Sequence, residues 1–160
     1  IFVSLNEVYV ANKDGDLFKR LSSRDGLLFP VLTGLDLDAT EFDSYRQKGR
    51  VKDAIEIAEA LEKYRAVFGR VEEIHFDGDL GWSIVTRSPN KNDGILRTHL
   101  GITALRRITV ARDVLNHLKE IKRDPEVIWV DGVKNPDRIH VRLRAARSIH
   151  DAERFVASAR

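Results

Sequence analysis

The 160-residue sequence contains neither cysteine nor methionine. The lack of cysteine excludes disulfide bonds, a thiol nucleophile and zinc held by thiolates. The sequence also lacks an apolar run of about 18 residues, the length that a helix needs to cross a bilayer. We therefore expect one soluble globular domain, and the missing initiator methionine indicates a fragment or a processed product of a longer chain.

Charge of both signs is present but unevenly distributed. Residues 1–80 carry 11 Lys and Arg against 16 Asp and Glu, whereas residues 81–160 carry 16 against 9. The net charge of +2 therefore hides an acidic first half and a basic second half. Because opposite charges attract, the second half is the better candidate for contact with an acidic partner.

The most informative segment is 138–144, in which charged or imidazole side chains alternate with aliphatic ones. This alternation predicts a β-strand with Ile139, Val141 and Leu143 facing a core. The side chains expected to face solvent are Arg138, His140, Arg142 and Arg144. No later strand-like run follows, so the strand could lie at an edge of its sheet and accept an extended partner as one more strand. A terminal strand whose arginines only keep the edge soluble explains the pattern equally well.

Other β-prone runs, bounded by turn residues, occur along the chain. They are residues 1–5, 8–11, 17–18, 73–77, 82–86, 95–100 and 127–130, and turns are predicted at 13–16, 78–79, 92–94 and 135–137. Residues 28–32 include Pro30, which cannot donate to a sheet ladder, so we expect them at an edge or in a connection. Trp82 and Trp129 are expected to pack in the core or on a sheet face.

Two segments repeat apolar residues at helical spacing. The first spans residues 51–68 and is followed by Gly69, a favourable C-terminal cap, and the second spans residues 105–121. The predicted fold is α+β, with a curved, mainly antiparallel β-sheet packed against two long amphipathic helices and the last strand at a sheet edge. The domain is expected to span residues 1–147, followed by a tail at 148–160 with the pattern of a short helix.

Several short motifs occur in order along the chain. They are residues 10–18, the Phe-Pro-Val-Leu-Thr-Gly sequence at 29–34, and residues 73–75, 81–82, 99–101 and 105–108. In their order and spacing they resemble the C-terminal extracytoplasmic β-domain of the bacterial cell-division protein family FtsQ, called DivIB in Gram-positive organisms. The resemblance covers nearly the whole chain.

The resemblance implies a domain without catalytic activity, bound metal or cofactor. Family members carry a cytoplasmic tail, one transmembrane helix and a POTRA domain ahead of this domain, which lies on the periplasmic side of the bacterial inner membrane. There the domain holds FtsB, and through it FtsL, and so supports septum formation. The partner is expected along the last strand, beside the second long helix, as an added strand.

The sequence departs from the family just before that strand. The family usually reads Val-Asp-Leu-Arg-Tyr, whereas Val130 and Asp131 are followed here by Gly132, Val133 and Lys134. The arginine and the tyrosine that contact the partner in the family are therefore missing. The candidate partner-binding residues are Val133, Lys134, Arg138, Ile139, His140, Val141 and Arg142.

Two other kinds of function stay open at the level of sequence. A metal-dependent hydrolase would use His75, Asp77 and Asp79, although the Asp-Gly-Asp sequence is also typical of an ordinary turn. A nucleic-acid-binding domain would use the arginines of the last strand together with Arg106, Arg107 and Arg112. Solvated basic helix faces are commoner than nucleic-acid sites, which weighs against the second of these functions.

Overall fold

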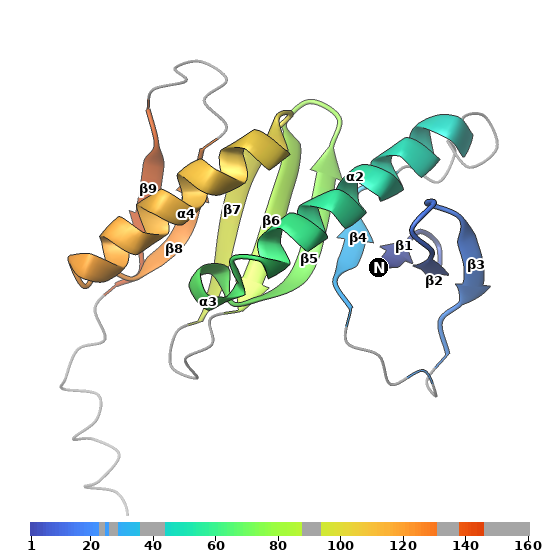
Figure 1. The fold of residues 1–160 in the computed structure, drawn as a ribbon, viewed down its shortest axis with the longest axis horizontal. Helices are drawn as coiled ribbons and strands as arrows, with labels where there is room; N and C mark the ends of the chain where they lie inside the picture. The colour runs from blue at the N-terminus through green and yellow to red at the C-terminus, as the bar shows by residue number, and fades with distance from the viewer. Residues whose placement is uncertain (23–24, 26–28, 36–43, 88–93, 131–137, 146–160) are drawn as a thin grey trace, which may run out of the picture.

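A computed structural model of the chain describes residues 1–22, 25, 29–35, 44–87, 94–130 and 138–145. These residues form an α+β fold, as predicted, with a nine-stranded sheet in the order β3-β2-β1-β4-β5-β6-β7-β8-β9. Helices α2, α3 and α4 lie on the same face of this sheet (Figure 1). The strands are β1 (Phe2–Ser4), β2 (Val8–Ala11), β3 (Leu17–Arg20), β4 (Val31–Thr33), β5 (Arg70–Asp77), β6 (Gly81–Arg87), β7 (Ile95–Gly101), β8 (Pro125–Trp129) and β9 (His140–Leu143).

The sheet is mixed, which corrects the prediction of a mainly antiparallel sheet. The pairs β1–β4, β4–β5 and β7–β8 are parallel, and the other neighbouring strands are antiparallel. Helix α2 (Ser44–Glu62) separates β4 from β5, and α4 (Ala104–Glu120) separates β7 from β8. A helix that packs on the sheet returns the chain to the end where the strand began, so the next strand runs parallel to it.

The first predicted helix is two helices. Helix α2 begins at Ser44, ahead of the first apolar position of the pattern. The sequence analysis missed this first part, because residues 44–50 are mostly polar and give no periodic signal. It ends at Glu62, and after a turn the short helix α3 (Arg65–Phe68) follows. Gly69 ends α3 with a φ of 81°, a conformation that favours glycine. The second predicted helix agrees with α4 to within one residue at each end.

The segment around Pro30 was wrongly expected at an edge or in a connection. Strand β4 lies inside the sheet, between β1 and β5. Pro30 precedes the strand and contributes only its carbonyl oxygen, which accepts the N–H of Phe2 at 3.0 Å. The missing donor of proline therefore costs the ladder nothing, because the proline is outside it.

The core lies between the helices and the covered face of the sheet. The fully buried side chains include Ile74, Ile84, Leu100 and Ile128 from the strands and Ala54, Leu61, Ile108 and Ala111 from the helices. Burial of each leucine or isoleucine side chain is worth about 1.5–3 kcal/mol, so the central strands are held firmly. Trp82 is buried beside Phe76, and Trp129 stacks on His99, which confirms the packing roles expected for both tryptophans.

Several sequence predictions lie outside the described residues and stay predictions. They concern the turn residues Asn92 and Asp93, the turn at 135–137, the candidate site residues Val133 and Lys134, and the tail at 148–160. The turn at 13–16 is confirmed. There the side-chain oxygen of Asn12 accepts the N–H groups of Asp14 and Asp16, each at 2.9 Å.

Candidate protein-binding site

Strand β9 forms one edge of the sheet. It pairs antiparallel with β8, with His140 opposite Trp129 and Val141 opposite Ile128. Among the described residues no strand lies on its other side, and Figure 1 shows β9 as the outermost strand beside α4. Within the described sheet, the backbone groups on that side of β9 have no neighbouring strand. The alternation of residues 138–144 predicted this strand, and the lack of a later strand-like run suggested its edge position.

The side chains of the candidate site are mostly exposed. Arg138, His140 and Arg142 are exposed, as predicted, and Val141 is half-buried against the core. Ile139 and Leu143 are on the same face as Val141 by alternation, but they are 38% and 41% exposed, so the burial expected of core-facing residues is not found. Only Val141 of the three reaches the core cluster, since β9 has a neighbouring strand on one side only.

The arginines of this segment have different partners. Arg142 donates from Nε to Glu126 Oε2 at 3.0 Å, and this pair is largely exposed. Arg144, which was expected to face outward, turns back toward the sheet and donates to Asp124 Oδ2 at 3.0 Å and to the carbonyl oxygen of Ile95 at 2.8 Å. Within the described part of the chain, Arg138 forms no ion pair.

An aromatic stack borders β9 on the face opposite the helices. The rings of His99 and Trp129 are 5.5 Å apart with 3° between their planes, and the register places Trp129 beside His140. Arg97 and Arg142 line the same groove, which has a volume of about 480 Å³. The sequence analysis assigned no role at this edge to His99 or Glu126. Only the pairing of β7, β8 and β9 brings these residues together.

The structure offers no support for a metal site at His75, Asp77 and Asp79. The Asp77 carboxylate accepts the backbone N–H groups of Leu80 and Asp79, each at 2.8 Å, and these bonds hold its pKa below the usual value. The ring of His75 contacts the Thr33 hydroxyl at 2.8 Å. No group of three potential ligands close enough for a metal occurs in the part of the chain that the structure describes. Asp77 therefore acts as a turn residue.

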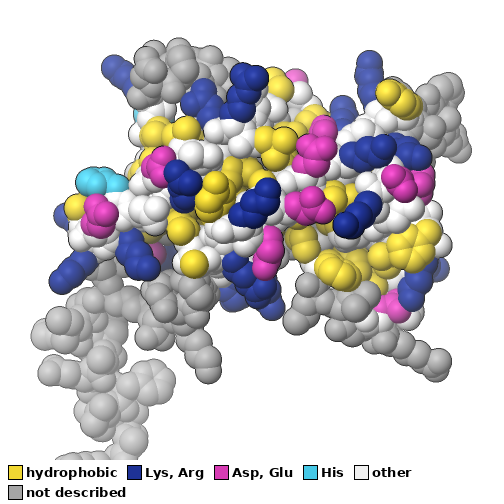
Figure 2. Space-filling model, viewed as in Figure 1, with side chains coloured by type: hydrophobic (Ala, Val, Ile, Leu, Met, Phe, Trp, Pro, Cys, Tyr) yellow, Lys and Arg dark blue, Asp and Glu magenta, His cyan; other side chains and the backbone are white. Residues whose placement is uncertain are grey.

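The structure likewise offers no support for a nucleic-acid site on the basic face of α4. Arg112 is engaged by Asp113 at 2.7 Å and lies over the ring of Tyr64, 5.0 Å from its centroid. Figure 2 shows acidic side chains interspersed with basic ones over the helical face of the molecule. Such a mixed surface gives no continuous positive track for a phosphate backbone.

The described residues define an α+β domain with helices on one face of a mixed sheet and with β9 as its last strand. The profile of the family described as "Cell division protein FtsQ/DivIB, C-terminal" matches residues 2–131, and the chain belongs to this family. The match ends immediately before the segment that leads into β9. The family thus accounts for the scaffold of the site, whereas the edge strand itself lies beyond the matched region.

Three relatives are named cell division protein FtsQ. That of Anaeromyxobacter sp. is 30% identical over 163 aligned residues, which cover 93% of this chain and 49% of that protein. That of Geotalea daltonii is 34% identical over 86 residues, or 52% of this chain and 31% of that protein. That of Myxococcus fulvus is 38% identical over 59 residues, or 37% of this chain and 21% of that protein. The chain spans at most about half the length of these relatives. No helix among the described residues is both long and apolar enough to cross a bilayer.

Proposed function

We propose that this domain is a non-enzymatic scaffold of the bacterial divisome. It acts on the periplasmic side of the inner membrane, where it binds an FtsB/FtsL-type partner by adding a strand of that partner to β9, and so supports septum formation. Membership of the FtsQ/DivIB family supports a role in cell division. The observation that carries the proposed binding mode is the open side of β9 in the described sheet.

Two exposed apolar residues, Ile139 just before β9 and Leu143 at its end, strengthen this proposal. Ile139 and Leu143 lie on the same side of the strand as Val141, because alternate residues of a strand share a face. Their exposed surface is available to a partner that extends the sheet, and burying it would add to the backbone hydrogen bonds. Each such bond contributes a net free energy of about 1 kcal/mol, so four strand residues alone give modest affinity and apolar anchors are needed.

Charge sets the register of the added strand in this proposal. An exposed ion pair is worth about 0.2–1 kcal/mol, which is enough to favour one alignment over another but not to hold a complex. Arg138 is the cation best placed for this role, because Arg142 already contacts Glu126. An acidic residue of the partner opposite Arg138 is therefore expected.

The test is calorimetric titration of the domain with the extracytoplasmic segment of an FtsB-like protein. The variants Val141→Pro and Val141→Glu should abolish binding. The Arg144 N–H donates toward the β8 side, so by alternation the Val141 N–H faces the open side, and proline removes it. The second variant places a carboxylate at a half-buried position. Circular dichroism and melting temperature must show that each variant is folded. Normal binding by a folded Val141→Pro variant would exclude the proposed site.

A matched control lies at the opposite edge of the sheet. Phe18 of β3 is 62% exposed, and β3 pairs with β2 alone among the described strands. The Phe18→Pro variant disturbs an edge strand to a similar degree but leaves β9 intact. It should bind the partner segment with unchanged affinity.

A further inference from the structure

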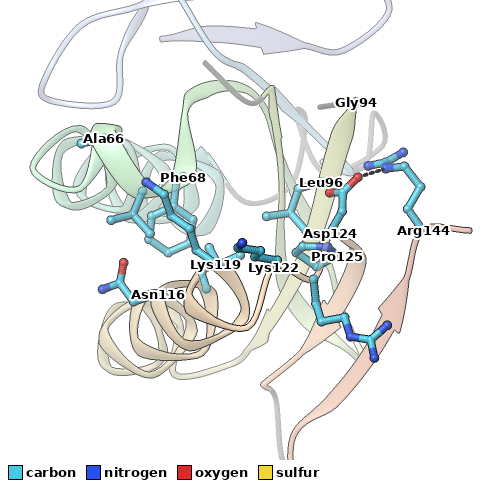
Figure 3. Close-up of a pocket in the computed structure, with 13 residues that line it drawn as sticks. Ala66, Phe68, Gly94, Leu96, Asn116, Lys119, Lys122, Asp124, Pro125 and Arg144 are labelled. Atoms are coloured by element: carbon cyan, nitrogen blue, oxygen red, sulfur yellow. Dashed lines mark hydrogen bonds and ion pairs between the residues drawn. The ribbon is translucent and has the colours of Figure 1, made fainter. Parts of the chain in front are cut away.

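A second concave site lies at the end of the sheet, away from the open side of β9. Figure 3 shows this pocket, which has a volume of about 270 Å³ and is formed by α3, the C-terminal turn of α4 and the first residues of β7 and β8. Its apolar lining includes Phe68, Leu96 and Leu115, which are 2%, 8% and 8% exposed. This volume is near the lower limit of ligand pockets, so it fits an apolar side chain rather than a large cofactor.

Cations surround this apolar lining. Lys119, Lys122, Arg123 and Arg144 all line the pocket, and the one carboxylate among the lining residues, that of Asp124, is held by Arg144 at 3.0 Å. Within the described residues, no ion pair engages Lys119, Lys122 or Arg123. The pocket therefore has a surplus of positive charge that its own acidic residue does not neutralise.

Lys122 has an unusual backbone conformation for a lysine. Its φ is 54°, and the N–H of the next residue, Arg123, donates to the carbonyl oxygen of Leu118 at 2.8 Å. This bond pattern ends a helix with a left-handed residue, a position at which glycine is the usual choice. Glycine would adopt this conformation with less strain. The chain instead has a lysine at this position, and its charged side chain lines the pocket.

We propose that this pocket binds an acidic peptide segment of a partner protein, which inserts one apolar side chain beside Phe68 and Leu115. The carboxylates of the segment then contact Lys119, Lys122 and Arg123. A peptide fits the site better than a membrane surface, because the Arg144 guanidinium is tied to Ile95 and Asp124 in the wall of a hollow and does not project toward a flat bilayer. This inference does not depend on strand addition at β9.

The test uses a labelled, capped peptide of aspartate and glutamate residues with one central leucine, measured by fluorescence anisotropy against the full chain at low salt. Removal of one cation in Lys122→Gly should weaken binding about two- to five-fold. The double variant Lys119→Gln with Arg123→Gln should weaken it further. The melting temperature of Lys122→Gly should stay equal or rise, because glycine adopts positive φ without strain. Lys13→Ala, in the exposed turn between β2 and β3, is the control with unchanged affinity.

A second peptide, in which glycine replaces the leucine, tests the apolar half of the site. Its affinity should be at least about five-fold lower, since the pocket lining then gains no contact. Equal affinity for the two peptides would overturn the proposal. So would an affinity of Lys122→Gly and of the double variant equal to that of the unmodified chain. So would binding of anionic lipid vesicles, lost in the same variants, without binding of the peptide. These results leave the β9 proposal untouched, because the Val141→Pro variant tests that site separately.

Discussion

The guanidinium of Arg144 donates a hydrogen bond to the carbonyl oxygen of Ile95, 2.8 Å away, and so joins the residue after β9 to the first residue of β7. The same side chain contacts Asp124 just before β8, and its own backbone N–H donates to the Asp124 carbonyl oxygen at 2.8 Å. One residue thus connects the ends of three neighbouring strands. The position of the edge strand depends on this connection as well as on the ladder with β8.

Replacement of Arg144 by alanine should therefore destabilise the domain. We expect Arg144→Ala to lower the free energy of unfolding by about 1–2 kcal/mol, because the Ile95 carbonyl and Asp124 both lose a charged donor. Urea denaturation followed by circular dichroism measures the change. Arg142→Ala is the matched control and should change stability by less than about 0.5 kcal/mol, because it removes only an exposed ion pair with Glu126. Equal effects of the two variants would contradict this role of Arg144.

Two buried threonine hydroxyls give a second prediction. Thr86 and Thr98 are both 0% exposed, and neither hydroxyl has a hydrogen-bond partner among the described residues. An unpaired buried hydroxyl is costly, so Thr86→Val should leave the free energy of unfolding unchanged or raise it by up to about 1 kcal/mol. The melting temperature should stay equal or rise accordingly.

Thr33→Val is the control for this prediction. The Thr33 hydroxyl donates to Glu73 Oε1 at 2.6 Å and contacts His75 Nδ1 at 2.8 Å. The same substitution there should lower stability by about 1 kcal/mol, since two polar partners lose their bond. Thermal unfolding measures both variants. A lower melting temperature for Thr86→Val than for Thr33→Val would contradict the prediction.

The ion pairs of Glu72 should make the free energy of unfolding depend on pH in the acidic range. Its carboxylate accepts from Arg87 Nε at 2.6 Å and Arg87 Nη2 at 3.1 Å, and from Arg70 Nη2 at 2.8 Å. These bonds, those from Arg87 first, lower the pKa of Glu72 below its usual value. A carboxyl whose pKa is lower in the folded state stabilises the fold above its unfolded pKa and loses that contribution as the pH falls through the folded value.

The variant Glu72→Gln isolates this contribution. At neutral pH it should unfold at a lower urea concentration than the unmodified chain, and the difference should shrink as the pH falls below about 4. Glu62→Gln removes an exposed pair with Arg65 and should show little difference at any pH. A constant difference for Glu72→Gln across the pH range would indicate a packing effect rather than a charge effect.

The sequence predicted local structure better than it predicted the order of the strands. Periodicity located α4 to within one residue, and alternation located β9, because both patterns arise from neighbours along the chain. The insertion of β4 between β1 and β5 left no such local signal, since it depends on where α2 returns the chain. The exposure of Ile139 and Leu143 was missed for a related reason. Alternation shows which residues share a face of a strand, but it does not show whether anything covers that face.

At the candidate site, too, the sequence predicted local features but not the contacts between residues far apart in the chain. The exposed positions of Arg138, His140 and Arg142 followed from the alternation. The pairing of Arg142 with Glu126 and the stacking of His99 on Trp129 did not, because these residues lie far apart in sequence. The inward turn of Arg144 was missed because its acceptors, Ile95 and Asp124, meet it only in the folded sheet.

The short length of β4 has a consequence for how the domain opens. This strand has three residues, and its parallel pairing with β1 is the connection that the strand order provides between β1–β3 and the rest of the sheet. Besides this pairing, β1–β3 are held to the domain by the buried Val3 and Ala11 and by the Asp16–Lys48 ion pair. Because these connections are few, we expect β1–β3 to open together before the long ladders of β5, β6 and β7. Amide protons of β1 to β3 should accordingly exchange with deuterium in one early phase, and those of β6 in a later one. The strength of the short β1–β4 junction therefore determines whether the nine strands unfold as one cooperative unit or as two.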